Sequence, residues 1–239
     1  MDAIILCGGR GTRLSGLYGD RPKALAPVAG RPFIEWQLRW LWRGGVERLH
    51  LAAGHLAGQL RAWLAQSPEA ARCTLSVEPS PLGTGGGLKF AAACLPAATL
   101  LVVNGDTLAP RLAFAALLAA HRAGGALLTL GVAPIADAGR YGTVEFDAQR
   151  RVTAFREKAE RTAGWINAGV YLAERALLER IPAGRPVSLE TEAFPALARE
   201  GQIAAFPVEP PLLDMGTPEG LREMDLYLQG PEGRKLLGA

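Results

Sequence analysis

Hydrophobic positions follow two alternating patterns in the first half of the chain. Short runs that are almost wholly apolar predict buried strands at residues 3–7, 49–53, 74–77 and 100–104. Between them, apolar residues at helical spacing predict helices at residues 32–43, 56–65 and 112–122, and a glycine-rich turn leads into another helix within residues 84–94. Continuous apolar strands that alternate with helices are typical of a mostly parallel sheet with both faces covered.

The pattern changes after about residue 126. Closely spaced strand-like segments occur at residues 127–132, 142–146, 152–155 and 165–172, followed by helices near 174–180 and 189–200, a strand at 203–208 and a helix at 218–228. No internal repeat or low-complexity linker interrupts the chain. We therefore predict an α/β fold, a Rossmann-like mixed, mostly parallel sheet flanked by helices, in a single domain over residues 1–239. Its two halves, residues 1–125 and 126–239, share that sheet.

The composition is that of an ordinary globular protein, with 49% hydrophobic and 21% charged residues. The net charge is only +3 and the basic residues are spread out, which argues against a nucleic-acid surface. No apolar stretch reaches the ~18 residues of a membrane span, and the first residues show no secretory signal. We expect a soluble, cytoplasmic protein, in which Cys7, Cys73 and Cys94 are buried thiols without metal-like spacing.

A glycine-rich run follows the first predicted strand. It reads Gly-Gly-Arg-Gly-Thr-Arg at residues 8–13, and Lys23 follows in an Arg-Pro-Lys sequence. Glycines at the carboxyl end of a strand let backbone N–H groups approach phosphate oxygens, and Arg13 and Lys23 add positive charge for a triphosphate. The run is neither a P-loop nor the G-x-G-x-x-G fingerprint of dinucleotide-binding folds. The added cations distinguish it from a simple tight turn.

The motifs together resemble those of the sugar nucleotidyltransferase family. The similarity starts with residues 4–14, Pro-Lys-Ala-Leu at 22–25 and Pro-Val at 27–28. It continues in order with Pro-Leu-Gly-Thr-Gly-Gly at 81–86, Asn-Gly-Asp at 104–106, Glu-Lys at 157–158, Asn-Ala-Gly at 167–169 and Asp-Met-Gly-Thr at 214–217. The resemblance covers residues 1 to about 225 and is greatest to the heptose-1-phosphate guanylyltransferases. Cys7 departs from the family's usual alanine, and its similar size indicates a packing role.

The resemblance implies a set of functional residues. Nucleotide binding would fall to the first half of the chain and sugar-phosphate binding to the second. The nucleotide site would comprise Leu6, Gly8, Gly9, Gly11, Thr12, Glu78, Gly83 and Thr84, with Arg13, Lys23 and Asp106 as catalytic residues. The sugar phosphate would contact Gly142, Glu157, Lys158, Asn167 and Gly169, with the Lys158 ammonium on its phosphate.

Asp106 and Asp214 are the predicted ligands of a Mg²⁺ cofactor. Asp106 follows a very apolar strand, and Asp214 precedes the last predicted helix. Mg²⁺ prefers one or two carboxylates together with phosphate oxygens and water. Taken alone, each aspartate is more often a turn former or a helix cap. The resemblance favours the metal reading.

The implied reaction joins a nucleoside monophosphate, taken from a nucleoside triphosphate, to a sugar 1-phosphate and releases pyrophosphate. The attacking phosphate oxygen is already ionised near neutral pH, so no general base is needed, and His50, His55 and His121 lie in no motif. Alternatives are a uridylyl- or mannose-1-phosphate-specific transferase, or a non-catalytic subunit that binds a nucleotide sugar. Because no hexapeptide repeats follow the motifs, we expect a compact enzyme rather than a bifunctional acetylating relative. Such an enzyme could form a homo-oligomer.

Glu78 is the candidate for reading the base. It follows the third predicted strand, where related pyrimidine-using enzymes can present a glutamine. Guanine offers adjacent N1–H and N2–H donors that a carboxylate can accept side by side, whereas uracil and thymine would turn two carbonyls toward it. The alternative is a solvated glutamate at a strand end. We predict GTP as the donor, and a manno-heptose 1-phosphate as the acceptor.

Overall fold

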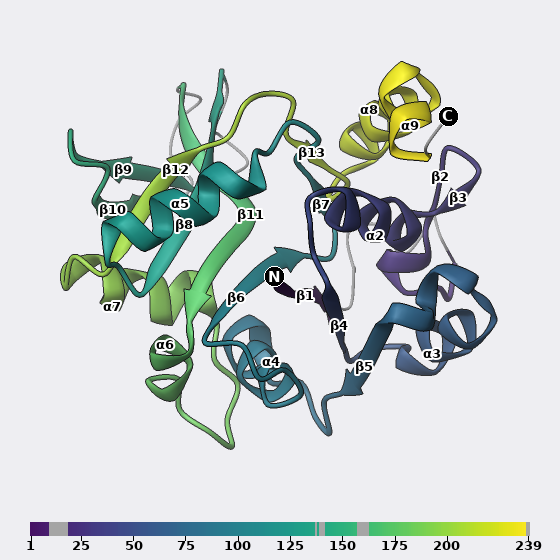
Figure 1. Cartoon of the computed structure of the whole chain (residues 1–239), viewed down its shortest axis with the longest axis horizontal. Coiled ribbons are helices and arrows are strands. Elements are labelled where there is room, and N and C mark those ends of the chain that lie inside the picture. Colours follow the sequence, from purple (N-terminus) through teal and green to yellow (C-terminus); the bar gives the residue numbers. More distant parts are fainter. Residues whose placement is uncertain (10–18, 137, 139–141, 157–162, 238–239) are drawn as a thin grey trace.

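A nine-stranded mixed sheet runs through the protein and carries strands from both halves of the chain (Figure 1). The computed structural model describes residues 1–9, 19–136, 138, 142–156 and 163–237. The central strand order is β10-β9-β11-β6-β1-β4-β5, with β8 paired to β11 and β12 paired to β8. The strands are β1 (Asp2–Cys7), β4 (Arg48–Ala53), β5 (Cys73–Val77), β6 (Thr99–Asn104), β8 (Leu128–Ile135), β9 (Thr143–Phe146), β10 (Val152–Arg156), β11 (Gly164–Glu174) and β12 (Ile203–Pro207).

The first half supplies four adjacent parallel strands, in the order β6-β1-β4-β5. Successive residues of β1 enter opposite cores: Ile5 belongs to one hydrophobic cluster and Ile4 to the other. Because both faces are buried, every position of such a strand must be apolar or paired, which explains the continuous apolar runs of the sequence. The carboxyl ends of these four strands meet at one edge of the sheet.

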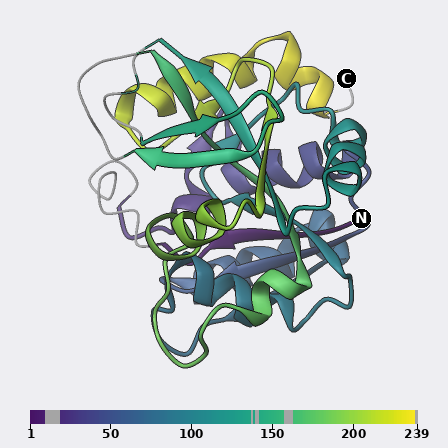
Figure 2. The same cartoon turned by 90° about the vertical axis from the view of Figure 1, so that its left-hand side faces the viewer.

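The second half adds mostly antiparallel strands, which lie above the purple and blue strands of the first half in Figure 2. β11 is the strand that joins the two halves, because it pairs antiparallel with β6, β8 and β9. Its register against β8 shifts between Asn167 and Tyr171. Gly169 lies in this bulge with φ +66°, a conformation that a glycine adopts without steric cost.

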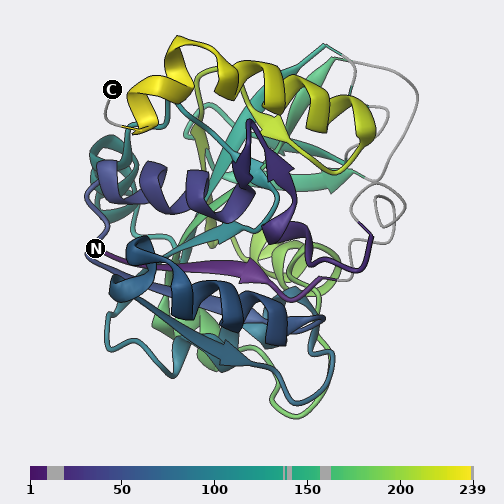
Figure 3. The same ribbon diagram turned by 90° about the vertical axis from the view of Figure 1, so that its right-hand side faces the viewer.

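Helices cover both faces of the sheet. The helices α2 (Phe33–Arg43), α3 (Ala57–Gln66), α5 (Phe114–Gly124) and α8 (Pro218–Gln229) contribute to one core. On the other face lie α4 (Gly83–Ala92), α6 (Arg175–Glu179) and α7 (Phe194–Arg199). A last helix, α9 (Pro231–Leu237), packs against α8 and α2, and Figure 3 shows these C-terminal helices in yellow alongside α2. The predicted fold class is confirmed.

The predicted strands and helices occur, with ends that differ by up to three residues. One predicted helix, at residues 189–200, is instead a π turn (η3, Leu189–Ala193) followed by α7. Pro195, the second residue of α7, has no N–H to donate, so a regular helix cannot continue through it. Several short elements were not predicted. They include α9 and the 3₁₀ turns η1 (Lys23–Leu25) and η2 (Pro68–Arg72). They also include two strand pairs: β2 (Pro27–Val28) with β3 (Arg31–Pro32), and β7 (Thr107–Leu108) with β13 (Leu213–Asp214). Strands of two residues are too short to show a period.

The cysteines correct one expectation. Cys7 is buried and Cys73 is partly buried, but Cys94 is exposed. Cys94 lies two residues beyond the end of α4, in a turn where its N–H bonds back to the Ala91 carbonyl. The prediction that all three thiols are buried is therefore wrong for this residue. Within the described ranges, no helix is long and apolar enough to cross a membrane.

Candidate active site

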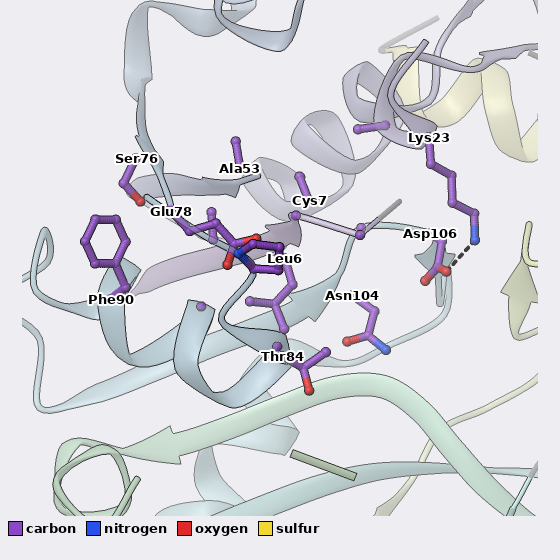
Figure 4. Close-up of a pocket in the computed structure, with 18 of the residues that line it drawn as sticks. Leu6, Cys7, Lys23, Ala53, Ser76, Glu78, Thr84, Phe90, Asn104 and Asp106 are labelled. Atoms are coloured by element: carbon purple, nitrogen blue, oxygen red, sulfur yellow. Dashed lines mark hydrogen bonds and ion pairs between the residues drawn. The ribbon is translucent and has the colours of Figure 1, made fainter. Parts of the chain in front are cut away.

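A cavity of about 590 Å³ opens where the four parallel strands end (Figure 4). Its walls include the last residues of β1, β4 and β6, the end of β5 and the first turns of α4. Every predicted nucleotide, metal or catalytic residue that the structure describes lines this cavity: Leu6, Gly8, Gly9, Lys23, Glu78, Gly83, Thr84, Asp106 and Asp214. Parallel strands bring motifs from distant parts of the chain to one edge, as the rule for open α/β sheets predicts.

Lys23 and Asp106 form an ion pair at one end of the cavity. The Lys23 ammonium donates to Asp106 Oδ2 at 2.5 Å, and the two side chains are 18% and 33% exposed. Figure 4 shows both groups facing the cavity. The pair spans 83 positions of the chain and joins the η1 turn to the loop after β6. A cation and an anion are thus already held where a polyphosphate and a metal ion would meet.

Asp214 reaches the same place through a short antiparallel pairing. β13 pairs with β7 so that Asp214 stands opposite Thr107, next to Asp106 in sequence, and Met215 N–H donates to the Asp106 carbonyl at 3.0 Å. Asp214 Oδ1 also accepts a bond from Gly216 N–H at 2.6 Å. Two cavity-lining carboxylates fit the preference of Mg²⁺ for few protein ligands plus phosphates and water. In the described part of the chain, no group of three or more acidic, histidine or cysteine side chains forms a closed metal site.

The loop that carries Asp106 is held from behind by Gln37 of α2. The fully buried Gln37 side chain donates from Nε2 to the carbonyls of Asn104, at 2.9 Å, and Thr107, at 2.8 Å. These carbonyls bracket Gly105 and Asp106. Gln37 thereby fixes the backbone on both sides of the carboxylate. Gln37 has helical spacing to the apolar Ile34 and Leu41, so the sequence places it on the buried face of α2 but does not show which carbonyls it bonds.

Glu78 lies in the wall formed by the end of β5. Its Oε2 accepts a bond from Leu82 N–H at 3.0 Å, and its carboxylate packs against the backbone at Gly8 and Gly54. A Cβ at residue 54 would collide with Glu78 Oε1, so Glu78 keeps this position only beside a glycine. The carboxylate is therefore fixed in the cavity wall. Glu78 is partly buried, and its role in reading the base stays a prediction.

The hydroxyl of Thr84 is used inside the protein. It donates to Glu190 Oε2 at 2.7 Å and accepts from Leu189 N–H at 2.8 Å. Gly83, with φ +71°, lies so close to the Val187 carbonyl that a Cβ there would clash. These contacts dock the start of α4 on the segment before α7. The predicted nucleotide contact at Thr84, which lines the cavity, stays a prediction.

The predicted sugar-phosphate residues that the structure describes, Gly142, Asn167 and Gly169, are not among the residues that line the cavity. Asn167 Nδ2 donates to the Tyr171 hydroxyl at 2.9 Å, and that hydroxyl donates to Asn104 Oδ1 at 3.4 Å. Gly169 lies against Asn104, which lines the cavity. Gly142 is further away, beside the carbonyl of Arg156. The remaining predicted site residues fall outside the described ranges: Gly11, Thr12, Arg13, Glu157 and Lys158.

Several residues of the cavity wall were not among the predicted contacts, among them Ser76, Gly87 and Phe90. Strand parity could have found Ser76, because residues two apart on a strand share a face and Glu78 was already a candidate. Helical spacing could have found Gly87, four residues after Gly83. Cys7 also lines the wall, and burial, together with the nearby Asp106 carboxylate, raises its pKa to about 12. Its thiol stays protonated at neutral pH, as a packing role requires.

A glycine-lined cavity with two adjacent carboxylates at the edge of a mixed sheet suits an enzyme that acts on nucleotides. Comparison with known proteins agrees, because the family model described as nucleotidyl transferase matches residues 2–229. The chain belongs to the nucleotidyl transferase family, in the group of sugar-1-phosphate guanylyltransferases.

Two curated relatives are close in sequence. The chain is 39% identical over 223 residues to a mannose-1-phosphate guanylyltransferase of Mycobacterium tuberculosis, in an alignment that covers 92% of this chain and 62% of that protein. It is 31% identical over 229 residues to the D-glycero-alpha-D-manno-heptose 1-phosphate guanylyltransferase of Aneurinibacillus thermoaerophilus, covering 96% and 99%. The chain thus spans less than two thirds of the first relative and nearly all of the second.

A solved structure has the same fold. HddC from Yersinia pseudotuberculosis superposes with a TM-score of 0.85 at 29% identity, over 95% of this chain and 98% of that chain. Its crystal structure complexed with GMP-PN superposes with a TM-score of 0.83 at 27% identity over the same shares.

Proposed function

We propose that this protein transfers GMP from GTP to a sugar 1-phosphate, giving a GDP-sugar and pyrophosphate. The observation that carries the proposal is the placement of Lys23, Asp106 and Asp214 together at one end of the glycine-lined cavity. A triphosphate there would find a cation, backbone glycines and two carboxylates. Only phosphorus–oxygen bonds form and break in this reaction. Its rate can therefore come from positioning of the two substrates and neutralisation of their phosphate charge.

The residues on the cavity wall suit a reaction without a general base. The acceptor oxygen of a sugar phosphate is already ionised near neutral pH, and no histidine is among the described residues that line the cavity. Lys23 would neutralise phosphate charge as the two anions approach each other. Asp106 and Asp214 would hold Mg²⁺, which when bound supplies electrostatic stabilisation of the transferring phosphoryl group. Arg13 and Lys158 stay predicted partners of the phosphates.

GTP is the proposed donor because of Glu78. A fixed carboxylate in the cavity wall matches the adjacent N1–H and N2–H donors of guanine and opposes the carbonyls of a pyrimidine. The names of the two curated relatives and the guanine nucleotide in the HddC complex support the same base.

For the acceptor we propose D-glycero-α-D-manno-heptose 1-phosphate, with mannose 1-phosphate as the rival. Near full-length coverage of the heptose relative and of HddC favours the heptose. The higher identity to the mycobacterial protein favours mannose. Both sugars share the manno configuration, so the Asn167 and Gly169 region would meet the same ring in either case.

Pyrophosphate release tests the proposal. GTP, UTP, CTP and ATP are each combined with mannose 1-phosphate, the heptose 1-phosphate and glucose 1-phosphate in the presence of Mg²⁺. We expect release with GTP and a manno-configured sugar. Binding of a GDP-sugar without release from any pair would show a non-catalytic subunit, and preference for UTP would show a uridylyltransferase.

A further inference from the structure

Ser76 places a hydroxyl in the same wall as Glu78. Both line the cavity, and both lie on the same face because they are two residues apart along β5 and its end. In Figure 4 the two side chains are neighbours on the cavity side of the strand. Their separation along the strand, roughly 6.6 Å, lets both reach one edge of a single base.

The adjoining wall suits a planar ring. α4 presents Gly87, whose missing side chain leaves space over Glu78, and Phe90 one turn further on. Phe90 is a large apolar side chain that remains 40% exposed, and it lines the same cavity as Ser76 and Glu78 (Figure 4). Aromatic rings stack on the flat faces of bases. This part of the cavity is therefore the base end, and Lys23 and Asp106 mark the phosphate end.

A buried histidine holds the Ser76 hydroxyl. His50 of β4 is 1% exposed, and its ring bridges two hydroxyls of β5: Nδ1 is 2.8 Å from Thr74 Oγ1 and Nε2 is 2.8 Å from Ser76 Oγ. Burial lowers the pKa of His50 below its ordinary value of 6.5. The ring is then neutral at physiological pH, with one nitrogen that donates and one that accepts.

The neighbours of Thr74 decide which nitrogen donates. Thr74 Oγ1 has the Leu49 carbonyl as acceptor for its own proton, at a long 3.5 Å. With the Thr74 proton on that carbonyl, its lone pairs face Nδ1 of His50, and we assign the ring proton to Nδ1 on this network. Nε2 is left as an acceptor and takes the proton of Ser76. Since that proton points away from the cavity, Ser76 Oγ offers the cavity only lone pairs.

We propose that Ser76 is a specificity-determining residue that accepts a hydrogen bond from the 2-amino group of guanine, and that His50 is its positioning residue. This inference rests on the proposed use of GTP. Guanine has three donors on one edge, N1–H and two N2–H. Glu78 accepts N1–H and one N2–H, and Ser76 accepts the other. Uracil and thymine have a single ring N–H between two carbonyls and would turn an acceptor toward each of these oxygens.

Inosine triphosphate isolates the contact because it is GTP without the 2-amino group. Dissociation constants of GTP and inosine triphosphate are measured by calorimetry, without sugar phosphate, for the native protein, Ser76→Ala and Ser80→Ala. Ser80 is exposed, in the loop after Glu78, and is absent from the cavity wall. We expect Ser76→Ala to weaken GTP binding about 3- to 10-fold, as for one neutral hydrogen bond, and to leave inosine triphosphate binding within about twofold. The Ser80→Ala control should match the native protein for both.

Other outcomes separate the inference from the function on which it rests. Equal losses for both nucleotides would assign Ser76 a structural role, and no loss for either would show that it does not touch the base. Both results overturn this inference and leave the GTP assignment standing. Native protein that binds UTP better than GTP overturns the donor assignment as well.

The ring of His50 gives an independent readout that a purely structural residue would not share. Nitrogen-15 shifts of the histidine rings, assigned to His50 by comparison with His50→Gln, should show the proton on Nδ1 and a bare Nε2 at about pH 7.5. A proton on Nε2, in a neutral or a charged ring, would make His50 the donor to Ser76 and overturn the proposal.

Discussion

The side chain of Asp106 is held by an ion pair, and the backbone around it is held by hydrogen bonds. Lys23 occupies one carboxylate oxygen, and the carbonyls next to it are fixed by Gln37 and Met215. An asparagine would keep the shape of the side chain and lose its charge. The fold should therefore survive substitution while the predicted metal function does not.

We expect Asp106→Asn to abolish pyrophosphate release almost completely, because the amide cannot anchor Mg²⁺ as a carboxylate does. Initial rates and thermal melting are measured for the variant and for Asp147→Asn, an exposed turn residue, as control. The native enzyme should also lose its activity in excess EDTA. Full activity of the variant, or EDTA-resistant activity of the native enzyme, would contradict the metal assignment.

Lys23→Ala should reduce kcat/KM for GTP, because the ammonium faces the triphosphate end of the cavity. The loss should correspond to about 1.5–3 kcal/mol, as for a charge-assisted hydrogen bond. Lys235→Ala is the matched control, since that lysine pairs with Glu232 on the surface. Steady-state kinetics of Lys23→Ala should show little change in the KM for the sugar phosphate. A raised KM for the sugar phosphate is instead the expected effect of Lys158→Ala. Equal effects on both substrates would rule out this division between the lysines.

At the scale of elements, α2 and the β6–β7 turn act as one unit. The fully buried Gln37 side chain bonds the carbonyls of Asn104 and Thr107, on either side of Asp106. Gln37→Leu should lower the free energy of unfolding by about 1–3 kcal/mol, because two buried carbonyls lose their partner. It should also lower kcat more than it raises KM, since Asp106 loses its fixed position.

Chemical denaturation and kinetics check the Gln37 prediction. Gln66→Leu, an exposed position at the end of α3, is the control for adding an apolar side chain. Loss of stability with unchanged kcat would show that Gln37 supports the fold and leaves the position of Asp106 unaffected.

A second link joins α5, β6 and β11 through Glu174. Its Oε1 accepts from Thr99 Oγ1 at 2.6 Å and from His121 Nε2 at 2.9 Å. Burial alone would raise the pKa of Glu174, but the bonds from Thr99 and His121 outweigh it and lower the pKa below 4.5. A depressed pKa stabilises the fold above the ordinary value, and this stabilisation is lost as the pH falls through the folded-state value.

Glu174→Gln should therefore be less stable than the native protein near neutral pH, and the difference should shrink below about pH 4.5. Urea unfolding at about pH 7 and about pH 4 measures both differences. Glu179→Gln, an exposed glutamate on α6, should show no such pH dependence. A difference that grows toward acid pH would reverse the sign of the argument.

At the scale of the whole molecule, one cavity draws its walls from both ends of the chain. The first half supplies Lys23, Glu78 and Asp106, and Asp214 comes from the far end of the second. β11 and the Thr84–Glu190 contact join the halves across the sheet and beside the cavity. Ligand binding should therefore stabilise the protein as a unit.

GTP with Mg²⁺ at 100 times its dissociation constant should add about 2.7 kcal/mol to the free energy of unfolding. For a chain of this size this raises Tm by roughly 5–10 °C. Differential scanning fluorimetry with GTP, UTP and EDTA measures the shift. UTP at the same concentration should raise Tm less, and Asp106→Asn should reduce the GTP shift. An equal shift with both nucleotides would contradict the Glu78 assignment. The division of labour between residues 1–125 and 126–239, like the oligomeric state, stays a prediction.

The sequence alone determined the layered fold and the position of the candidate site. Strands buried on both faces need unbroken apolar runs, so β1, β4 and β6 are visible as such runs. Motifs that directly follow such strands must lie at the carboxyl edge of the sheet. That is why Gly8, Glu78 and Asp106 could be expected together before any distance was known.

The tertiary structure decided the contacts that hold this site. Lys23 meets Asp106 across 83 residues, Gln37 reaches the same loop from α2, and His50 aligns Ser76 from a neighbouring strand. None of these pairings follows a local period, because each depends on how separate elements pack and on which buried polar groups then need a partner. Periodicity reports which face of a strand or helix is buried, whereas the partner of a polar atom is set by the whole fold.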